Sequence, residues 1–263
     1  PYKIPNFGYP KMRLNLIIEY TDGSTQRVNS DPGTWKLTAE GPIRSNNEYD
    51  GEIYNANMEL GEWTKVGYDD SKWQSVTIPH DWAIYGPFSI HNDRQNVAIT
   101  QDGQKEAMEH AGRTGGLPFV GVGWYRLEFE AEGFSEGKRA SLIFDGAMSH
   151  ARVYVNGEEV GYWPYGYNAF HFDITEQLKV GEVNELAVRL ENETDSSRWY
   201  PGAGLYRNVH LVVTEDAYVP EWGTQIMTTE IGPKHADVTQ TTEFVVPEGK
   251  QFSDYRIHTQ IFD

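Results

Sequence analysis

Two short segments of the sequence combine aromatic rings with charged side chains. Residues 78–88 read IPHDWAIYGPF, and residues 196–211 read SSRWYPGAGLYRNVHL. Carboxylate and guanidinium groups form charge-assisted hydrogen bonds with hydroxyls, and Trp faces pack on apolar C–H surfaces. Such groups suit a neutral ligand with many hydroxyls, such as a sugar.

Familiar signatures of nucleophilic, phosphate-binding and metal-dependent catalysis are missing from the sequence. It contains no Gly-x-Ser-x-Gly turn, no Gly-Lys-Thr phosphate loop and no His-Glu-x-x-His helix. His80 precedes an acid, but a Ser/His/Asp arrangement also needs a nucleophile, and none can be assigned. A glycosidase-type acid pair cannot be picked out by spacing, because carboxylates are numerous and most are explained by a solvated acidic surface. We therefore assign no catalytic residue.

Three acidic segments could supply oxygen ligands to a hard cation. They are YDDSKW (68–73), NETDSS (192–197) and NEYDGE (47–52). None follows the EF-hand loop pattern, and Asp and Asn side chains also cap turns. Turn capping is therefore the main alternative to a structural calcium. We assign no metal ligand and expect no other cofactor.

The segment VGYWPYGYNAF (160–170) crowds aromatic residues around a Pro/Gly turn. In a β-sandwich such residues commonly fill the core or a corner. Aromatic side chains on loops at one end of a sandwich can instead form a stacking surface with polar handles. Both interpretations stay open at this point.

The overall composition restricts the class of partner. The 263 residues include 39 Asp and Glu against 22 Lys and Arg, for a net charge of −17. Such a surface repels nucleic-acid phosphates and anionic lipids, so we expect neither a nucleic-acid nor a membrane partner. The absence of cysteine excludes disulfides, thiolate nucleophiles and cysteine metal sites.

Alternating apolar residues and turn signals predict an all-β fold. Residues 14–28 predict a hairpin, and residues 139–163 predict three strands. Residues 168–192 predict two strands joined by a short helical turn capped at Asp173 or Thr175. The predicted turns lie at Asp22-Gly23, Asp145-Gly146 and Asn156-Gly157.

Short strands at this spacing favour a β-sandwich, and we expect one two-sheet sandwich over residues 74–214. Residues 89–118 form a long polar connection in which QKEAMEHA could make about two helical turns. A new run of alternating strands begins after Glu215. The chain does not begin with Met, so we expect a natural fragment, a truncation, a fusion or a processed form.

Several motifs together resemble the N-terminal sugar-binding domain of glycoside hydrolase family 2, most closely its β-galactosidase branch. They are DDSKWQSVTIPHDWAIYGPF, GVGWYRLEFE, LIFDGAMSHARVYVNGEEVGYW, FDITEQLKVGEVNELAVRL and SSRWYPGAGLYRNVHL. The resemblance covers roughly residues 65–215. It implies a galactose-binding-like jelly-roll sandwich. Residues 217–263 resemble the opening strands of the immunoglobulin-like domain of that family.

The first 70 or so residues instead resemble the N-terminal accessory domain of bacterial α-L-rhamnosidases, especially at GPIRSNNEYDGE (41–52). Both families use galactose-binding-like jelly rolls. We therefore expect a jelly-roll domain over residues 1–216, with residues 1–70 as its rhamnosidase-like segment, and the start of an immunoglobulin-like domain at 217–263.

The family 2 resemblance implies a catalytic (β/α)8 barrel elsewhere in the parent enzyme, with the jelly roll completing the sugar pocket. His80, Asp81 and Trp82 would contact the sugar from one loop, and Arg198 and Trp199 from another. The alternative is that Asp81 and Arg198 form a structural ion pair. Alternatives for the whole chain are a free-standing carbohydrate-binding module, an interdomain spacer and a rhamnosidase accessory domain. The resemblance also favours a periplasmic or secreted bacterial protein.

Overall fold

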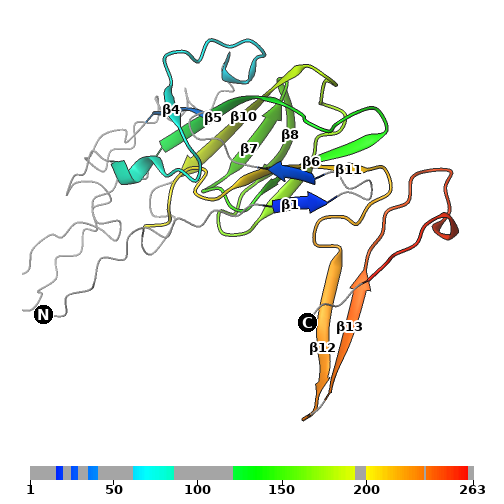
Figure 1. Cartoon of the computed structure of the whole chain (residues 1–263). Coiled ribbons are helices and arrows are strands. Elements are labelled where there is room, and N and C mark those ends of the chain that lie inside the picture. Colours follow the sequence, from blue (N-terminus) through cyan, green and yellow to red (C-terminus); the bar gives the residue numbers. More distant parts are fainter. Residues whose placement is uncertain are drawn as a thin grey trace, which may run out of the picture.

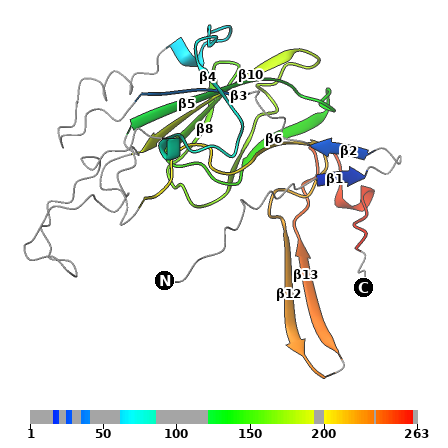
Figure 2. The same cartoon turned by 60° about the vertical axis from the view of Figure 1, so that its left-hand side comes forward.

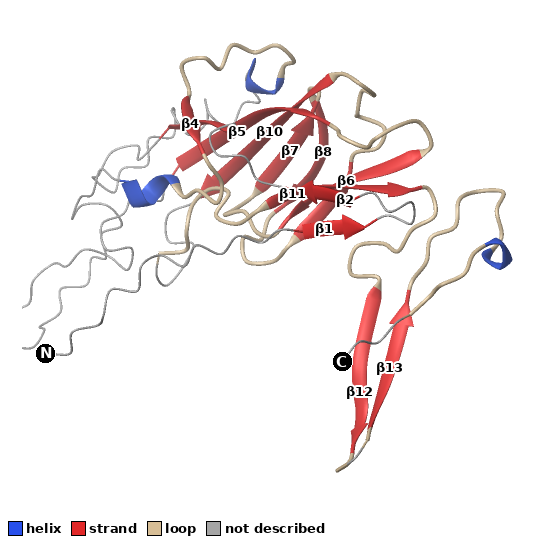
Figure 3. Ribbon diagram, in the orientation of Figure 1, coloured by secondary structure: helices blue, strands red, loops and turns tan. Residues whose placement is uncertain are grey.

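The computed structural model of the chain is almost entirely β-structure (Figures 1 and 3). Its central part is a sandwich of a six-stranded and a three-stranded sheet. The structure describes residues 16–19, 25–28, 35–40, 62–85, 121–192, 200–233 and 235–259. The predicted all-β sandwich is therefore confirmed over the described part of residues 74–214.

The larger sheet is antiparallel between every pair of neighbours. Its strands, in spatial order, are β4 (Gln74–Val76), β3 (Trp35–Glu40), β5 (Gly121–Glu130), β10 (Val183–Asn192), β7 (Ala151–Val155) and β8 (Glu158–Trp163). The long strands β5 and β10 lie at the centre, paired from Val183–Glu130 to Asn192–Gly121.

The smaller sheet covers one face of the larger one. Its order is β11 (Val209–Glu215), β6 (Lys138–Phe144) and β9 (Phe170–Asp173). The main hydrophobic core lies between the two sheets, where Phe144 and Phe170 stack with ring centroids 4.8 Å apart. Tyr125, Val188 and Leu205 are also completely buried there.

Local turn chemistry accounts for the predicted hairpin tip and helical turn. Asn156 and Gly157 have φ values of 50° and 87°, as the tight turn between β7 and β8 requires. The Asp173 carboxylate accepts a hydrogen bond from the Thr175 backbone amide at 2.9 Å, which confirms the capped turn after β9. The turn predicted at Asp145-Gly146 does not join two paired strands. It begins the connection from β6, in the smaller sheet, to β7, in the larger sheet.

The rhamnosidase-like segment contributes to the same sandwich. It forms the predicted hairpin of β1 (Leu16–Glu19) and β2 (Thr25–Val28), and it inserts β3 between β4 and β5. Trp35 and Leu37 of β3 are buried in the main core. The 3₁₀ turn η1 (Glu62–Thr64) brings Trp63 against Trp124 on the other face of the larger sheet. Residues from this segment therefore pack on both faces of one sheet.

The C-terminal part differs sharply from the sandwich. Strands β12 (Thr224–Ile231) and β13 (Ala236–Thr242) form a hairpin that extends away from both sheets, as Figures 1 and 2 show. The short turn η3 (Phe252–Asp254) follows. Alternating strands after Glu215 are thus confirmed, while the division into two domains stays a prediction. The long connection at 89–118 lies outside the described residues. Within the described ranges, no helix has the length and apolarity needed to cross a membrane.

Candidate functional site

Two loops meet at one end of the sandwich. The first follows β4 and contains the 3₁₀ turn η2 (Trp82–Tyr85), and the second leads into β11. The His80 backbone amide donates to the Leu205 carbonyl at 2.8 Å. The Ala203 amide donates to Asp81 Oδ2 at 3.1 Å. The predicted residues of the first loop therefore lie directly against the segment that follows Trp199.

Asp81 joins the two loops through its carboxylate. Oδ1 accepts a hydrogen bond from the Ala83 amide at 2.9 Å, and the Tyr200 hydroxyl lies 2.6 Å from both carboxylate oxygens. Burial, followed by the hydrogen bond to Asp81, raises the pKa of Tyr200, so its hydroxyl stays protonated and donates. A carboxylate has about four acceptor positions, and the donors among the described residues place two contacts on each oxygen.

His80 is buried beneath this junction. Its Nδ1 lies 3.0 Å from the Tyr125 hydroxyl, and only 7% of the residue is exposed. Burial lowers the pKa of His80, although the neighbouring Asp81 charge opposes that effect. His80 is therefore neutral near pH 7, and its position suits it to hold the loop rather than to contact a ligand.

Two glycines allow the close packing of this end. A Cβ on Gly123 of β5 would lie 2.4 Å from the Trp82 ring. Gly204 has a φ of +95°, and a Cβ there would lie 2.3 Å from the Tyr125 hydroxyl. The Trp82 ring thus packs closely on β5 and stays half-buried, while Ile84 beside it is 48% exposed.

The structure therefore brings His80, Asp81 and Trp82 to one site. Arg198 and Trp199 lie outside the described residues, so their contact with Asp81 stays a prediction. Tyr200 and Tyr125, which hold Asp81 and His80, were not among the predicted site residues. Tyr200 follows Trp199 directly, and Tyr125 occupies an alternating position of β5, but neither position alone reveals a partner far away in the chain.

The aromatic segment at 160–170 contains both core residues and exposed residues, so each of the two interpretations applies to part of it. Trp163 and Phe170 stack with centroids 5.7 Å apart and belong to the core. Tyr165 and Tyr167 are instead 54% and 44% exposed. Tyr162, on β8, is 42% exposed as well. These exposed rings, unlike Trp163 and Phe170, can offer a surface to a ligand.

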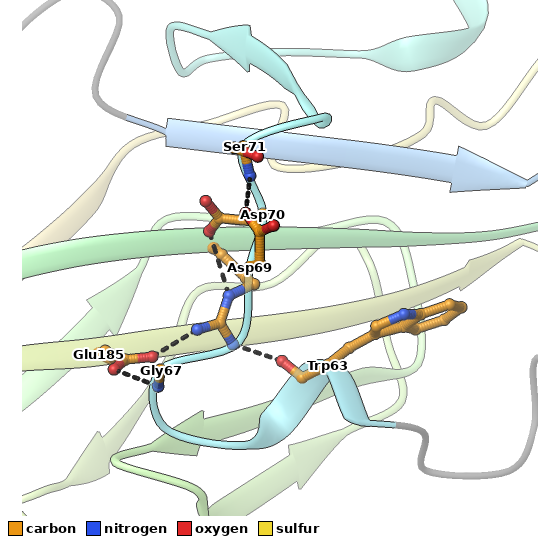
Figure 4. A network of polar contacts seen from close by, with 7 residues as sticks. Trp63, Gly67, Asp69, Asp70, Ser71 and Glu185 are labelled. Atoms are coloured by element: carbon orange, nitrogen blue, oxygen red, sulfur yellow. Dashed lines mark hydrogen bonds and ion pairs between the residues drawn. The ribbon is translucent and has the colours of Figure 1, made fainter.

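The acidic segment at 68–73 is used for folding. Asp69 accepts a hydrogen bond from the Ser71 amide at 3.1 Å, which confirms turn capping there. Asp70 pairs with Arg126, whose guanidinium also binds Glu185 and the Trp63 carbonyl (Figure 4). In the described part of the chain, no group of three or more His, Asp or Glu side chains could hold a metal ion. Residues 47–52 and 193–197 lie outside that part.

Comparison with protein families identifies two matching regions. Residues 69–215, more than half of the chain, match the glycosyl hydrolases family 2 sugar binding domain. Residues 2–101 match the alpha-L-rhamnosidase N-terminal domain, which extends the rhamnosidase resemblance beyond the predicted limit near residue 70. The two matches overlap at the segment that carries His80, Asp81 and Trp82.

Similar proteins come from both groups. A beta-galactosidase of Bacteroides ovatus, BoGH2A, is 39% identical over 180 residues, which are 68% of this chain and 19% of that protein. An alpha-L-rhamnosidase of Formosa agariphila is 46% identical over 67 residues, 26% of this chain and 7% of that protein. Other relatives are named beta-glucuronidases.

A beta-glycosidase structure from Bacteroides vulgatus matches with a TM-score of 0.62 and 26% identity, over 84% of this chain and 24% of that one. The chain spans about a fifth of the length of the galactosidase and about a quarter of that structure. The match over residues 69–215 and the shared fold agree. The chain therefore belongs to the sugar-binding domain family of the family 2 glycosyl hydrolases.

Proposed function

We propose that this chain is the non-catalytic sugar-binding module of a parent glycoside hydrolase, of β-galactosidase type. The observation that carries the proposal is the Asp81 carboxylate, which joins two loops at one end of the sandwich through hydrogen bonds to Ala83, Tyr200 and Ala203. The half-buried Trp82 ring beside it offers an apolar surface to a pyranose.

A neutral sugar fits this chain better than an anionic one. The net charge of −17 disfavours the approach of a carboxylated sugar such as a glucuronide. The relatives named beta-glucuronidases favour the alternative, a glucuronide ligand. The beta-galactosidase relative, at 39% identity, supports the neutral choice.

Catalysis is assigned to a barrel elsewhere in the parent protein, with the loops of this module completing its pocket. Arg198 and Trp199 would contact the same sugar from the second loop. We further propose that residues 217–263 begin an immunoglobulin-like domain, and that the parent protein is periplasmic or secreted. The rivals are a free-standing carbohydrate-binding module and a rhamnosidase accessory domain.

The proposal is tested with the chain itself. Purified chain should bind galactose, and Asp81→Asn and Trp82→Ala should weaken binding while circular dichroism stays unchanged. The chain should hydrolyse neither aryl β-galactosides nor aryl α-rhamnosides. Equal galactose affinity in wild type and both variants would refute the binding role, and hydrolysis by pure chain would refute the non-catalytic one.

A further inference from the structure

A second pair of aromatic rings lies at the same end of the sandwich. Tyr165 and Tyr167, here called the tyrosine pair, occupy the loop between β8 and β9. Their ring centroids lie 5.5 Å apart at an angle of 59°. Exposed fractions of 54% and 44% leave both rings open to solvent.

The backbone beneath the tyrosine pair is firmly held. The Tyr206 hydroxyl donates to the Gly166 carbonyl at 2.7 Å. A Cβ on Gly166 would lie 2.2 Å from Met148 Sδ, so the loop packs closely on Met148. Met148 and Gly204 in turn exchange two backbone hydrogen bonds at 3.0 Å. The tyrosine pair is thus tied to the loop that binds Asp81, and little loop ordering remains to oppose ligand binding.

Polar side chains lie on residues next to this loop and on the residue that anchors it. The Arg207 guanidinium lies over the Tyr206 ring, 5.3 Å from its centroid, and donates to the Asp145 carbonyl at 3.2 Å. Burial raises the pKa of Tyr206, so its hydroxyl remains a donor. Asn168, next to Tyr167, is also exposed. The exposed Asn168 side chain is therefore a hydrogen-bonding group next in sequence to the Tyr167 ring.

We propose that the tyrosine pair is a second carbohydrate contact, which binds a pyranose unit of an oligosaccharide whose terminal unit occupies the Asp81 site. This inference rests on the proposed function. Exposed aromatic rings offer apolar faces on which the C–H surface of a pyranose can pack. A stable protein interface, by contrast, buries about 1,200 Å² or more in total. A neighbouring domain of the parent protein is the alternative occupant.

The test compares ligands of two lengths. Galactose and a β-linked galactotetraose are titrated into wild-type chain, Tyr165→Ala/Tyr167→Ala, Asp81→Asn and the matched control Trp222→Ala. Trp222 is 60% exposed and belongs to the turn before β12. Because the substituted rings are exposed, the variants should fold, which thermal unfolding verifies.

We expect the double tyrosine variant to lose about tenfold in affinity for the tetrasaccharide and to keep its galactose affinity. Trp222→Ala should bind both like wild type. Asp81→Asn should weaken both ligands. If only the tyrosine variant weakens binding, the Asp81 site fails and the tyrosine contact survives.

Wild-type tetrasaccharide affinity in the double variant would overturn the inference and favour a protein occupant. A tetrasaccharide that binds wild-type chain no more tightly than galactose would overturn it as well.

Discussion

Strands β5 and β10 are paired in the same way as β12 and β13, but the two pairs differ in how far their side chains are buried. Both pairs are antiparallel ladders. Tyr125 and Val188, from the first pair, are completely buried, whereas Ile226 and Ile231 are 66% and 79% exposed. Hydrogen-bonded pairing alone therefore does not create a core. A two-stranded hairpin is marginally stable until another layer covers it.

The two regions differ in whether their own residues bury their apolar side chains. The sandwich buries its apolar side chains between its own sheets. Exposed apolar side chains on β12 and β13, such as Met227 and Val238, have no such layer among the described residues. This contrast supports the proposal that residues 217–263 begin another domain.

Truncating a buried aromatic side chain should have the largest effect on the free energy of unfolding. Phe144→Ala should lower the free energy of unfolding by about 3–5 kcal/mol, because Phe144 is fully buried against Phe170. Ile231→Ala, in the exposed hairpin, should change it by less than about 0.5 kcal/mol. Urea unfolding of both variants checks the comparison. Similar losses in the two variants would show that the hairpin has a core of its own.

Breaking the buried ion-pair network should have the next largest effect. Arg126→Met should cost about 3 kcal/mol, because it leaves Glu185 and Asp70 without their shared cation. Lys65→Met, which removes an exposed pair with Glu62, serves as the control and should cost almost nothing. Equal thermal unfolding midpoints for Arg126→Met and wild type would contradict the role of Arg126 in holding residues 62–70 on the sheet.

Removing the Tyr200 hydroxyl should have an intermediate effect. Tyr200→Phe deprives Asp81 of a donor and should cost about 1–2 kcal/mol. The control is Tyr162→Phe, whose hydroxyl bonds His150 at an exposed position. Urea unfolding should separate the two variants. A larger loss of unfolding free energy in Tyr162→Phe than in Tyr200→Phe would contradict the structural role of the Tyr200–Asp81 hydrogen bond.

The smallest expected effect is a pH dependence. Because burial lowers the pKa of folded His80 below its ordinary value of 6.5, the unfolded chain binds a proton more readily. The His80 contribution to stability is therefore complete above that value and is lost as the pH falls toward the lowered pKa. His80→Gln should flatten the stability curve in this window. Parallel curves for wild type and His80→Gln would exclude this linkage.

Much of the fold follows from local patterns. The Asn156-Gly157 turn and the Asp173 cap depend on residues adjacent in sequence, so the pattern predicts them. The insertion of β3 between β4 and β5 depends on pairing across a long stretch of chain. Local alternation carries no information about such a partner.

The candidate site divides in the same way. His80, Asp81 and Trp82 were predicted because one short segment resembles a motif of the family 2 sugar-binding domain. The donation from Tyr200 to Asp81 joins residues separated by 119 positions. It became visible only when the two loops were brought together. The interpretation of 68–73 as a turn was correct for Asp69, but the pairing of Asp70 with Arg126 required the folded sheet.

Hydrogen–deuterium exchange of the full chain, with and without saturating galactose, tests the central claim most directly. Without sugar, amides of β5 and β10 should exchange slowly and those of β12 and β13 rapidly. Galactose should slow exchange at residues 80–83 and 200–206 and leave β12 and β13 unchanged. Protection confined to β12 and β13, or no change at either loop, would contradict a sugar site at the Asp81 end of the sandwich.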